Sequence, residues 1–341
     1  MLREALVLDI ARLDRIRLTA RPRTQMVVAR GILVPNYRLA GVKTVIEGRE
    51  NLPEEPVIYA MNHTDRYNYF PFQLSLYTRM HRFTATWVKG KYFENPGVAT
   101  FMEKTNNLPA VSRGYIITRD LLAVLGRRPE DAEYAALRKA VDAVAAGQGD
   151  AAAVDAELRT QVPPALLTVP RDMLGRPFDP LAETYAEAVN GTFGRMMRRF
   201  VELHEEAFRV GLDVIIFPEG TRSKRLSRGR IGLAQVALRY RKTVVPVGCN
   251  GSDRIYPGSN PFAKRGEVTY RIGAPMRYED MAEFHVPEPF VPFDARDEAK
   301  HRARFQGYVD RVMERIDPLL DPEYRMRGGT SGGVRGSHRF L

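Results

Sequence analysis

Cysteine is almost absent from this 341-residue chain, because Cys249 is the only one, and an internal disulfide framework is therefore excluded. This favours a reducing compartment. Long apolar runs are also missing, since no stretch reaches the roughly 18 residues of a membrane-spanning helix. Asp9 and Asp14 interrupt the N-terminal apolar stretch and do not suit a secretory signal. We therefore expect a protein that is soluble or peripherally bound to a membrane.

The sequence also shows no internal repeat and no pattern of histidines at the spacing of metal ligands. The histidines other than His63 are scattered, so we predict no metal site. They are His81, His204, His285, His301 and His338.

Acidic residues are scarce where basic residues gather. The formal net charge is +11, and residues 221–230 hold five basic residues and no acidic one. Residues 3–30 hold seven arginines against three acidic residues. Such patches attract nucleic acid, an anionic bilayer, coenzyme A or an acidic carrier protein. We find no nucleic-acid-binding module with clustered aromatics among basic residues, so we expect no nucleic-acid partner.

An apolar content of 44% is sufficient for a large core. Residues 1–20 place Leu2, Leu6, Ile10, Leu13 and Ile16 near helical spacing, which predicts an amphipathic helix that docks on the protein body or lies on a membrane. We assign 1–42 to an N-terminal amphipathic helical segment.

Short apolar stretches bounded by turn residues predict buried, mostly parallel strands. The stretch at 107–113 is the weakest, because Pro109 removes a ladder donor. The helix expected at 229–241 joins two strands and indicates a parallel, right-handed crossover. The expected strands lie at 42–48, 56–62, 83–88, 107–113, 213–217, 243–250 and 267–276.

Residues 116–210 are rich in alanine and charge and predict helices, with a proline-rich loop at 163–180. A terminal helix is expected at 296–320, and the Gly- and Ser-rich residues 321–341 predict a flexible tail. The predicted fold is α/β, with a mixed, largely parallel central sheet flanked by helices. It forms one domain over 43–320, with 116–210 as an extra helical insertion that could be a lid, an acyl-chain cover or a membrane-contacting cap.

The segment YAMNHTDRYNYFPF at 60–73 places a lone histidine, His63, directly after a buried strand. Asp65 and Asn68 follow it within five residues. The aromatic residues nearby could wall an apolar slot or could be ordinary core: Tyr67, Tyr69, Phe70 and Phe72. The segment is either a polar loop or a general base beside an apolar site.

The segment FPEGTRSK at 217–224 is the most specific motif. Gly220 permits a tight turn at the carboxyl end of a strand, the edge where open α/β sheets bind ligands. Thr221 and Arg222 then present a hydroxyl and a guanidinium that can grip phosphate. Glu219 is unusual there, because a carboxylate repels phosphate; it could fix Arg222 or bond a substrate hydroxyl.

The order of these motifs resembles the glycerolipid acyltransferase family, the glycerol-3-phosphate and 1-acylglycerol-3-phosphate acyltransferases. Asn62–Asn68 matches the family's histidine block, and residues 217–223 match its Phe-Pro-Glu-Gly block nearly ideally. LPAVSR, ending at Arg113, corresponds to the arginine block, and residues 244–248 correspond to the Val-Pro block. The resemblance covers about 43–275.

The resemblance implies an O-acyltransferase that moves a fatty acyl group from acyl-CoA or acyl-ACP to a hydroxyl of a lysophospholipid or of glycerol-3-phosphate. An alcohol is a weak nucleophile near neutral pH, so the reaction needs a base, and a neutral histidine suits that task. His63 would be this base. By resemblance, Arg113, Glu219 and Arg222 bind phosphate and glycerol, with Gly220 and Thr221 beside them. No cofactor is implied beyond the acyl-thioester co-substrate.

One position departs from the family pattern. The family has an aspartate where this chain has Asn68. Asp65 could fold back onto His63 and is the favoured replacement, or the Asn68 carbonyl oxygen could accept the imidazole N–H. A weak or inactive enzyme is the third reading, and its form would be a catalytically impaired lipid-binding protein.

The partners implied are a glycerophospholipid acceptor, acyl-CoA or acyl carrier protein, and an anionic membrane surface. We expect the protein in the cytoplasm, peripheral at the inner face of the membrane.

Overall fold

The computed structural model describes residues 7–326. Its core is a seven-stranded sheet with the order β1-β9-β8-β2-β7-β3-β4, in which only the β8–β9 pair is antiparallel. The predicted α/β class with a mixed, largely parallel sheet is confirmed. The strands are β1 (Val42–Glu47), β2 (Ile58–Met61), β3 (Thr84–Lys89), β4 (Asn107–Ala110), β7 (Asp213–Ile216), β8 (Val244–Asn250) and β9 (Gly266–Ile272).

Strand β2 is the centre of the sheet, and all of its residues are buried. Ile58 and Ala60 face one apolar core, while Tyr59 and Met61 face the other. A strand covered on both faces needs a continuous apolar sequence, and residues 57–61 supply one. The loops that leave the carboxyl end of β2 therefore start from a rigid base.

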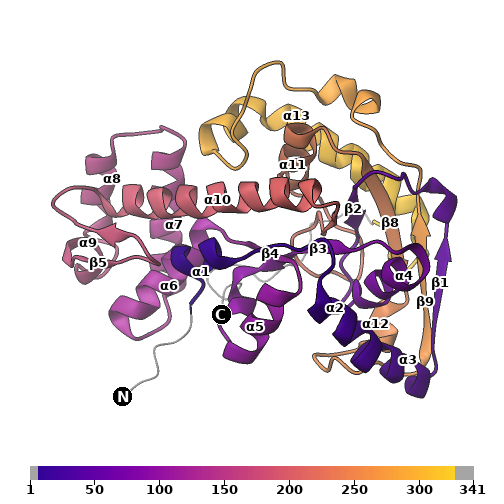
Figure 1. Cartoon of the computed structure of the whole chain (residues 1–341). Coiled ribbons are helices and arrows are strands. Elements are labelled where there is room, and N and C mark those ends of the chain that lie inside the picture. The colour runs from indigo at the N-terminus through magenta and orange to yellow at the C-terminus, as the bar shows by residue number, and fades with distance from the viewer. Residues whose placement is uncertain (1–6, 327–341) are drawn as a thin grey trace.

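Helices cover both faces of the sheet (Figure 1). One face packs against α10 (Tyr185–Arg209), α11 (Gly232–Tyr240) and α13 (Ala295–Ile316). The other packs against α3 (Val34–Ala40), α4 (Phe70–Met80) and α12 (Ser252–Ile255). The remaining short elements are α2 (Arg23–Val28), the π-helical turn η1 (Ala29–Leu33), the 3₁₀ turns η2 (Arg49–Asn51), η3 (Gly90–Phe93), η4 (Glu279–Phe284) and η5 (Asp317–Leu319), and α5 (Pro96–Lys104).

The predicted crossover through α11 is parallel, but its two strands are not neighbours. Both β7 and β8 pair with β2, which lies between them. The edge strand β4 accommodates Pro109, because only one side of an edge strand is needed for the ladder.

The helical insertion gathers at one end of the molecule, and α10 reaches from it to the sheet (Figure 1). The expected proline-rich loop at 163–180 contains a short helix and a small hairpin. The elements are α6 (Arg113–Leu125), α7 (Asp131–Ala145), α8 (Ala151–Leu158), α9 (Ala165–Thr168), β5 (Arg171–Asp172) and β6 (Pro177–Phe178).

The N-terminal helix is shorter than expected. Helix α1 covers only Ile10–Arg15, with Asp9 capping its start, and it docks on the protein body through buried Leu13 and Ile16. Arg195 of α10 pairs with Asp14 at 2.5 Å and reinforces this docking. The predicted apolar positions Leu2 and Leu6 lie outside the described residues.

The expected flexible tail begins with packed residues. Tyr324 is buried, its backbone oxygen accepts a hydrogen bond from Leu226 N, and its hydroxyl donates to Asp253. Residues 327–341 lie outside the described part of the chain. No helix within residues 7–326 is long and apolar enough to cross a bilayer.

Candidate active site

The site forms where β2 and β7 end side by side. His63 follows β2, and the segment 217–223 follows β7. The His63 N–H donates to Glu219 Oε1 at 2.9 Å, and Ser223 N–H donates to the His63 carbonyl oxygen at 2.8 Å. The backbone of the histidine is therefore held on both sides by the motif that lies some 155 residues later in the chain.

Asn68 is the side chain that orients the imidazole. Its Oδ1 lies 3.2 Å from His63 Nδ1, and its Nδ2 donates to the Asn62 carbonyl oxygen at 2.8 Å. Because that second bond identifies Oδ1 as the acceptor, His63 Nδ1 carries the hydrogen. The ring also stacks on Phe217, with ring centroids 4.1 Å apart. Nε2 is then the unprotonated nitrogen and the only one that can act as a base.

The imidazole is electrically neutral at physiological pH. Burial is the main cause that lowers the pKa of His63 to about 3; the hydrogen bond of Asn68 opposes the shift, and the nearby cations Arg222 and Lys89 add to it. A neutral ring can accept a proton without first losing one.

Asp65 does not fulfil the expectation that it folds back onto His63. Its carboxylate instead accepts hydrogen bonds from Thr64 Oγ1 at 3.0 Å and from Tyr67 N–H at 2.8 Å. Burial raises the pKa of Asp65. The physical reason is local: the aspartate closes a turn with the backbone two residues ahead, and this points it away from the imidazole.

Glu219 is buried and connects the loop after β2, at His63, with Ser227 further along its own loop. It is 1% exposed, and beyond its bond to His63 its Oε2 accepts from both Ser227 N–H and Ser227 Oγ, at 2.9 and 2.8 Å. Burial raises the pKa of Glu219 to about 7, although these hydrogen bonds oppose the rise. Both carboxylate oxygens are engaged within the protein, so the role that the structure shows for Glu219 is positioning of His63.

A cavity of about 590 Å³, here called the main cavity, opens beside the imidazole. His63, Gly220 and Arg222 all line it. Gly220 has φ +67°, a conformation that suits glycine and lets the chain turn back toward the cavity. His63 and Arg222, which lie far apart in the sequence, therefore line the same cavity.

The wall of the main cavity is largely aromatic and aliphatic. Tyr67, Tyr69 and Phe70 line it, whereas Phe72 is fully buried core and packs edge-on against Tyr59 at 5.1 Å. The other apolar lining residues are Val28, Ile32, Leu33, Trp87, Val88, Tyr92, Val98, Phe101, Met102, Ala110, Phe217, Pro261 and Phe262. An apolar space of this size suits a hydrocarbon chain.

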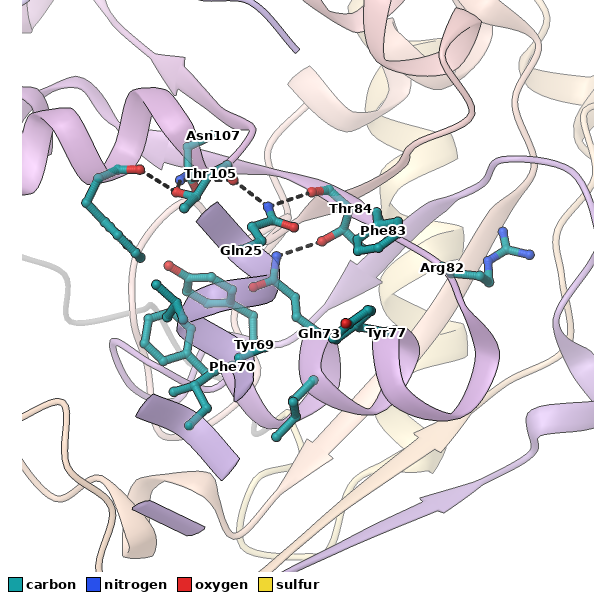
Figure 2. Close-up of a pocket in the computed structure, with 15 residues that line it drawn as sticks. Gln25, Tyr69, Phe70, Gln73, Tyr77, Arg82, Phe83, Thr84, Thr105 and Asn107 are labelled. Atoms are coloured by element: carbon teal, nitrogen blue, oxygen red, sulfur yellow. Dashed lines mark hydrogen bonds between the residues drawn. The ribbon is translucent and has the colours of Figure 1, made fainter. Parts of the chain in front are cut away.

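A small pocket of about 50 Å³, lined by both apolar and polar side chains, shares Tyr69 and Phe70 with the main cavity. Figure 2 shows the side-chain amides of Gln25 and Gln73 meeting at Thr84. Gln73 Nε2 donates to Thr84 Oγ1 at 2.6 Å, and Gln25 Nε2 donates to the Thr84 carbonyl oxygen at 3.2 Å. The apolar lining thus ends at hydrogen-bonded amides.

Arg113 does not line the main cavity. It begins α6, its Nε donates to Asn190 Oδ1 at 2.6 Å, and its guanidinium lies over the Phe193 ring at 4.2 Å. Burial lowers its pKa. Arg113 therefore ties α6 to α10 in this structure. Thr221 is also absent from the lining.

Three basic residues that we did not assign to the site line the main cavity beside Arg222: Arg66, Lys89 and Lys91. Lys89 ends β3, so its place at the carboxyl edge of the sheet was a usable signal. Arg66 and Lys91 lie on a loop and a 3₁₀ turn, where pattern says little about side-chain direction. No cluster of metal-ligating side chains occurs among residues 7–326.

Residues 43–140, which include His63 and Asn68, are similar to a known protein family. The family model described as Acyltransferase matches residues 43–140. The match covers less than a third of the chain. It contains the histidine block with Asn68, and it ends before the segment 217–223.

Among solved structures, the chain is similar to the 1-acyl-sn-glycerophosphate (LPA) acyltransferase PlsC from Thermotoga maritima. The identity is 18% and the TM-score 0.40, over 89% of this chain and 86% of that chain. No curated protein matches the chain in sequence.

Proposed function

We propose that this acyltransferase-family chain moves a fatty acyl group from a thioester of coenzyme A or acyl carrier protein to a hydroxyl of a lysophospholipid or of glycerol-3-phosphate. The observation that supports this most strongly is the neutral His63, with Nε2 as its basic nitrogen, in one apolar cavity with Arg222. The apolar wall suits the acyl chain, and the basic residues suit a phosphate group.

The reaction follows from this geometry. Nε2 of His63 takes the proton of the acceptor hydroxyl as its oxygen bonds to the thioester carbonyl carbon. The tetrahedral intermediate then collapses, the carbon–sulfur bond breaks, and the imidazolium returns the proton to the departing thiolate. Asn68 keeps the ring in the required tautomer, and Glu219 holds its backbone.

Purified protein incubated with an acyl thioester and lysophosphatidate or glycerol-3-phosphate tests the proposal. We expect thiol release together with an acylated product identified by mass spectrometry. Binding of the lipid without thiol release would favour the alternative, a catalytically impaired lipid-binding protein, which Asn68 keeps open.

Arg222 and Arg113 form a matched pair for testing phosphate binding. We expect Arg222→Gln to raise KM for a phosphorylated acceptor by about 10- to 100-fold, because a charge-assisted contact to phosphate is lost. Arg113→Gln should leave this KM nearly unchanged, since Arg113 bonds Asn190 outside the main cavity. Steady-state kinetics at varied acceptor concentration measure both, and equal KM values for the two variants would contradict the assignment.

The rim of the main cavity supports a further part of the proposal, that the protein docks on an anionic membrane. Ile32 and Phe262 line the cavity and are 51% and 60% exposed. They lie within 15–46 and 254–266, two basic segments without a single aspartate or glutamate. Exposed apolar side chains among basic residues suit an anionic bilayer surface.

The double variant Ile32→Ser/Phe262→Ser is expected to bind anionic vesicles at least about tenfold more weakly, because two apolar side chains no longer enter the bilayer. Co-sedimentation with vesicles containing phosphatidylglycerol measures this. Val291→Ser is the control, because Val291 is 59% exposed but lies outside the two basic segments and outside the helical insertion. Unchanged binding of the double variant would remove the rim from the docking surface.

A further inference from the structure

Trp87, the single tryptophan of the chain, stands between two cavities. It lies on β3 and lines the main cavity, and it also lines a neighbouring cavity of about 340 Å³, here called the second cavity. The two cavities share six lining residues: Trp87, Lys89, Lys91, Ala110, Phe217 and Gly220. His63 lines only the main cavity.

Two of the shared residues are large enough to form a wall, Trp87 and Phe217. Phe217 stacks on the catalytic imidazole, so its position is already set by His63. Trp87 makes no such contact with the site. Its orientation must therefore be fixed from the other side, by α10 and its neighbours.

His204 of α10 holds the indole. The Trp87 Nε1–H donates to His204 Nε2 at 2.6 Å, and His204 Nδ1 lies 2.7 Å from the Phe200 carbonyl oxygen. A carbonyl can only accept, so Nδ1 carries the hydrogen and Nε2 accepts from the indole. Burial lowers the pKa of His204 to about 4, which keeps this tautomer neutral.

Aromatic packing removes the remaining freedom of the indole. The Phe200 ring meets it edge-on at 5.1 Å, and Phe293 lies at 6.2 Å. A Cβ atom added at Gly232 would come within 3.4 Å of the indole ring. The indole is therefore confined by Phe200 and Phe293, and on the side of the second cavity by the close approach of Gly232.

We propose that Trp87, held in place by His204, is a specificity-determining wall that confines the acyl chain to the main cavity and closes it off from the second cavity. This rests on the proposed acyl transfer, which puts the reacting thioester beside His63. It also gives α10, and through it the helical insertion, a role in substrate selection. A bulkier or longer acyl chain would be excluded by the indole.

Acyl-chain selectivity tests the wall. Trp87→Ala should raise kcat/KM for a longer or branched acyl thioester relative to a straight 16-carbon one by about 10-fold or more, the size of effect that one or two methylene groups have in a pocket. Trp87→Phe should keep most of the native ratio. A loss of rate that is equal for both thioesters would mean that Trp87 is structural only and would overturn the proposal.

His204 offers a matched pair of variants. His204→Gln keeps an acceptor for the indole N–H and should retain the native selectivity, whereas His204→Phe removes the acceptor and should shift the ratio toward that of Trp87→Ala. Equal ratios in the two His204 variants would show that the bond does not position Trp87.

Fluorescence supplies a readout that does not depend on turnover. Because Trp87 is the only tryptophan, its emission reports directly on the wall. Titration with palmitate, a non-reacting probe, should give a saturable emission change in the native protein and in His204→Gln, and a smaller one in His204→Phe. The absence of a saturable change in the native protein would overturn the placement of the chain against Trp87, even if no acyl transfer were found.

Discussion

Replacement of His63 by alanine is expected to lower kcat for acyl transfer by about 10²- to 10⁴-fold, the usual contribution of a general base. The ring is the only base placed in the main cavity with a defined tautomer, because Nδ1 is committed to Asn68. KM should change much less, since Arg222 and the apolar wall remain. Thiol release under saturating substrates measures the effect.

A second histidine provides the control. His81 is exposed at the end of α4 with φ 55°, a left-handed conformation that asparagine tolerates well. His81→Asn should therefore retain both fold and activity. If His63→Ala kept most of the native kcat while the circular dichroism spectrum showed an intact fold, the mechanism derived above would be wrong.

Replacement of Asn68 by aspartate is expected to change the pH dependence of kcat/KM. In the native protein the pKa of His63 is about 3, so the base is already neutral across the neutral range and loses no activity through protonation there. A carboxylate 3.2 Å from Nδ1 would stabilise the imidazolium and raise this pKa by about 1 to 3 units. Activity of the variant should then fall as the pH drops through the raised value, at about pH 4 to 6.

The same variant should be faster at neutral pH, by about tenfold, because a base whose pKa lies closer to the working pH accepts a proton more readily. Profiles of kcat/KM between pH 4.5 and 9 test both effects. Asp65→Ala is the comparison: its carboxylate bonds Thr64 and Tyr67, so the variant should keep the native profile shape. A large loss of kcat/KM at neutral pH in Asp65→Ala, with an intact circular dichroism spectrum, would show that Asp65, and not Asn68, acts on the imidazole.

The sequence was sufficient to predict that His63 and the segment 217–223 meet at one edge of the sheet. His63 and the segment 217–223 each follow a continuous apolar strand, and parallel strands present their carboxyl ends at one edge. What the sequence did not reveal is the strand order. The insertion of β2 between β7 and β8 brings His63 directly beside Glu219, and this depends on long-range pairing that no local pattern encodes.

Side-chain direction was the second limit. Arg113 was expected at the end of a strand, but β4 ends at Ala110, Arg113 begins α6, and its guanidinium turns toward Asn190 and Phe193 on α10. Asp65 follows a turn geometry that takes its carboxylate away from His63, whereas Asn68 reaches the ring because it lies at the far side of that turn. Each of these outcomes depends on the direction of a side chain, which residue type and spacing leave open.

The double attachment of the His63 backbone has a consequence for the choice of acceptor. Glu219 and Ser223 both bond the backbone of His63, and they belong to the same short segment as Arg222. The backbones of His63 and Arg222 therefore keep the same separation whichever molecule is bound. The distance between the backbones of His63 and Arg222 is therefore fixed. If the chain carries out the proposed acyl transfer, we expect it to discriminate between glycerol phosphates whose free hydroxyl sits one carbon nearer to, or farther from, the phosphate.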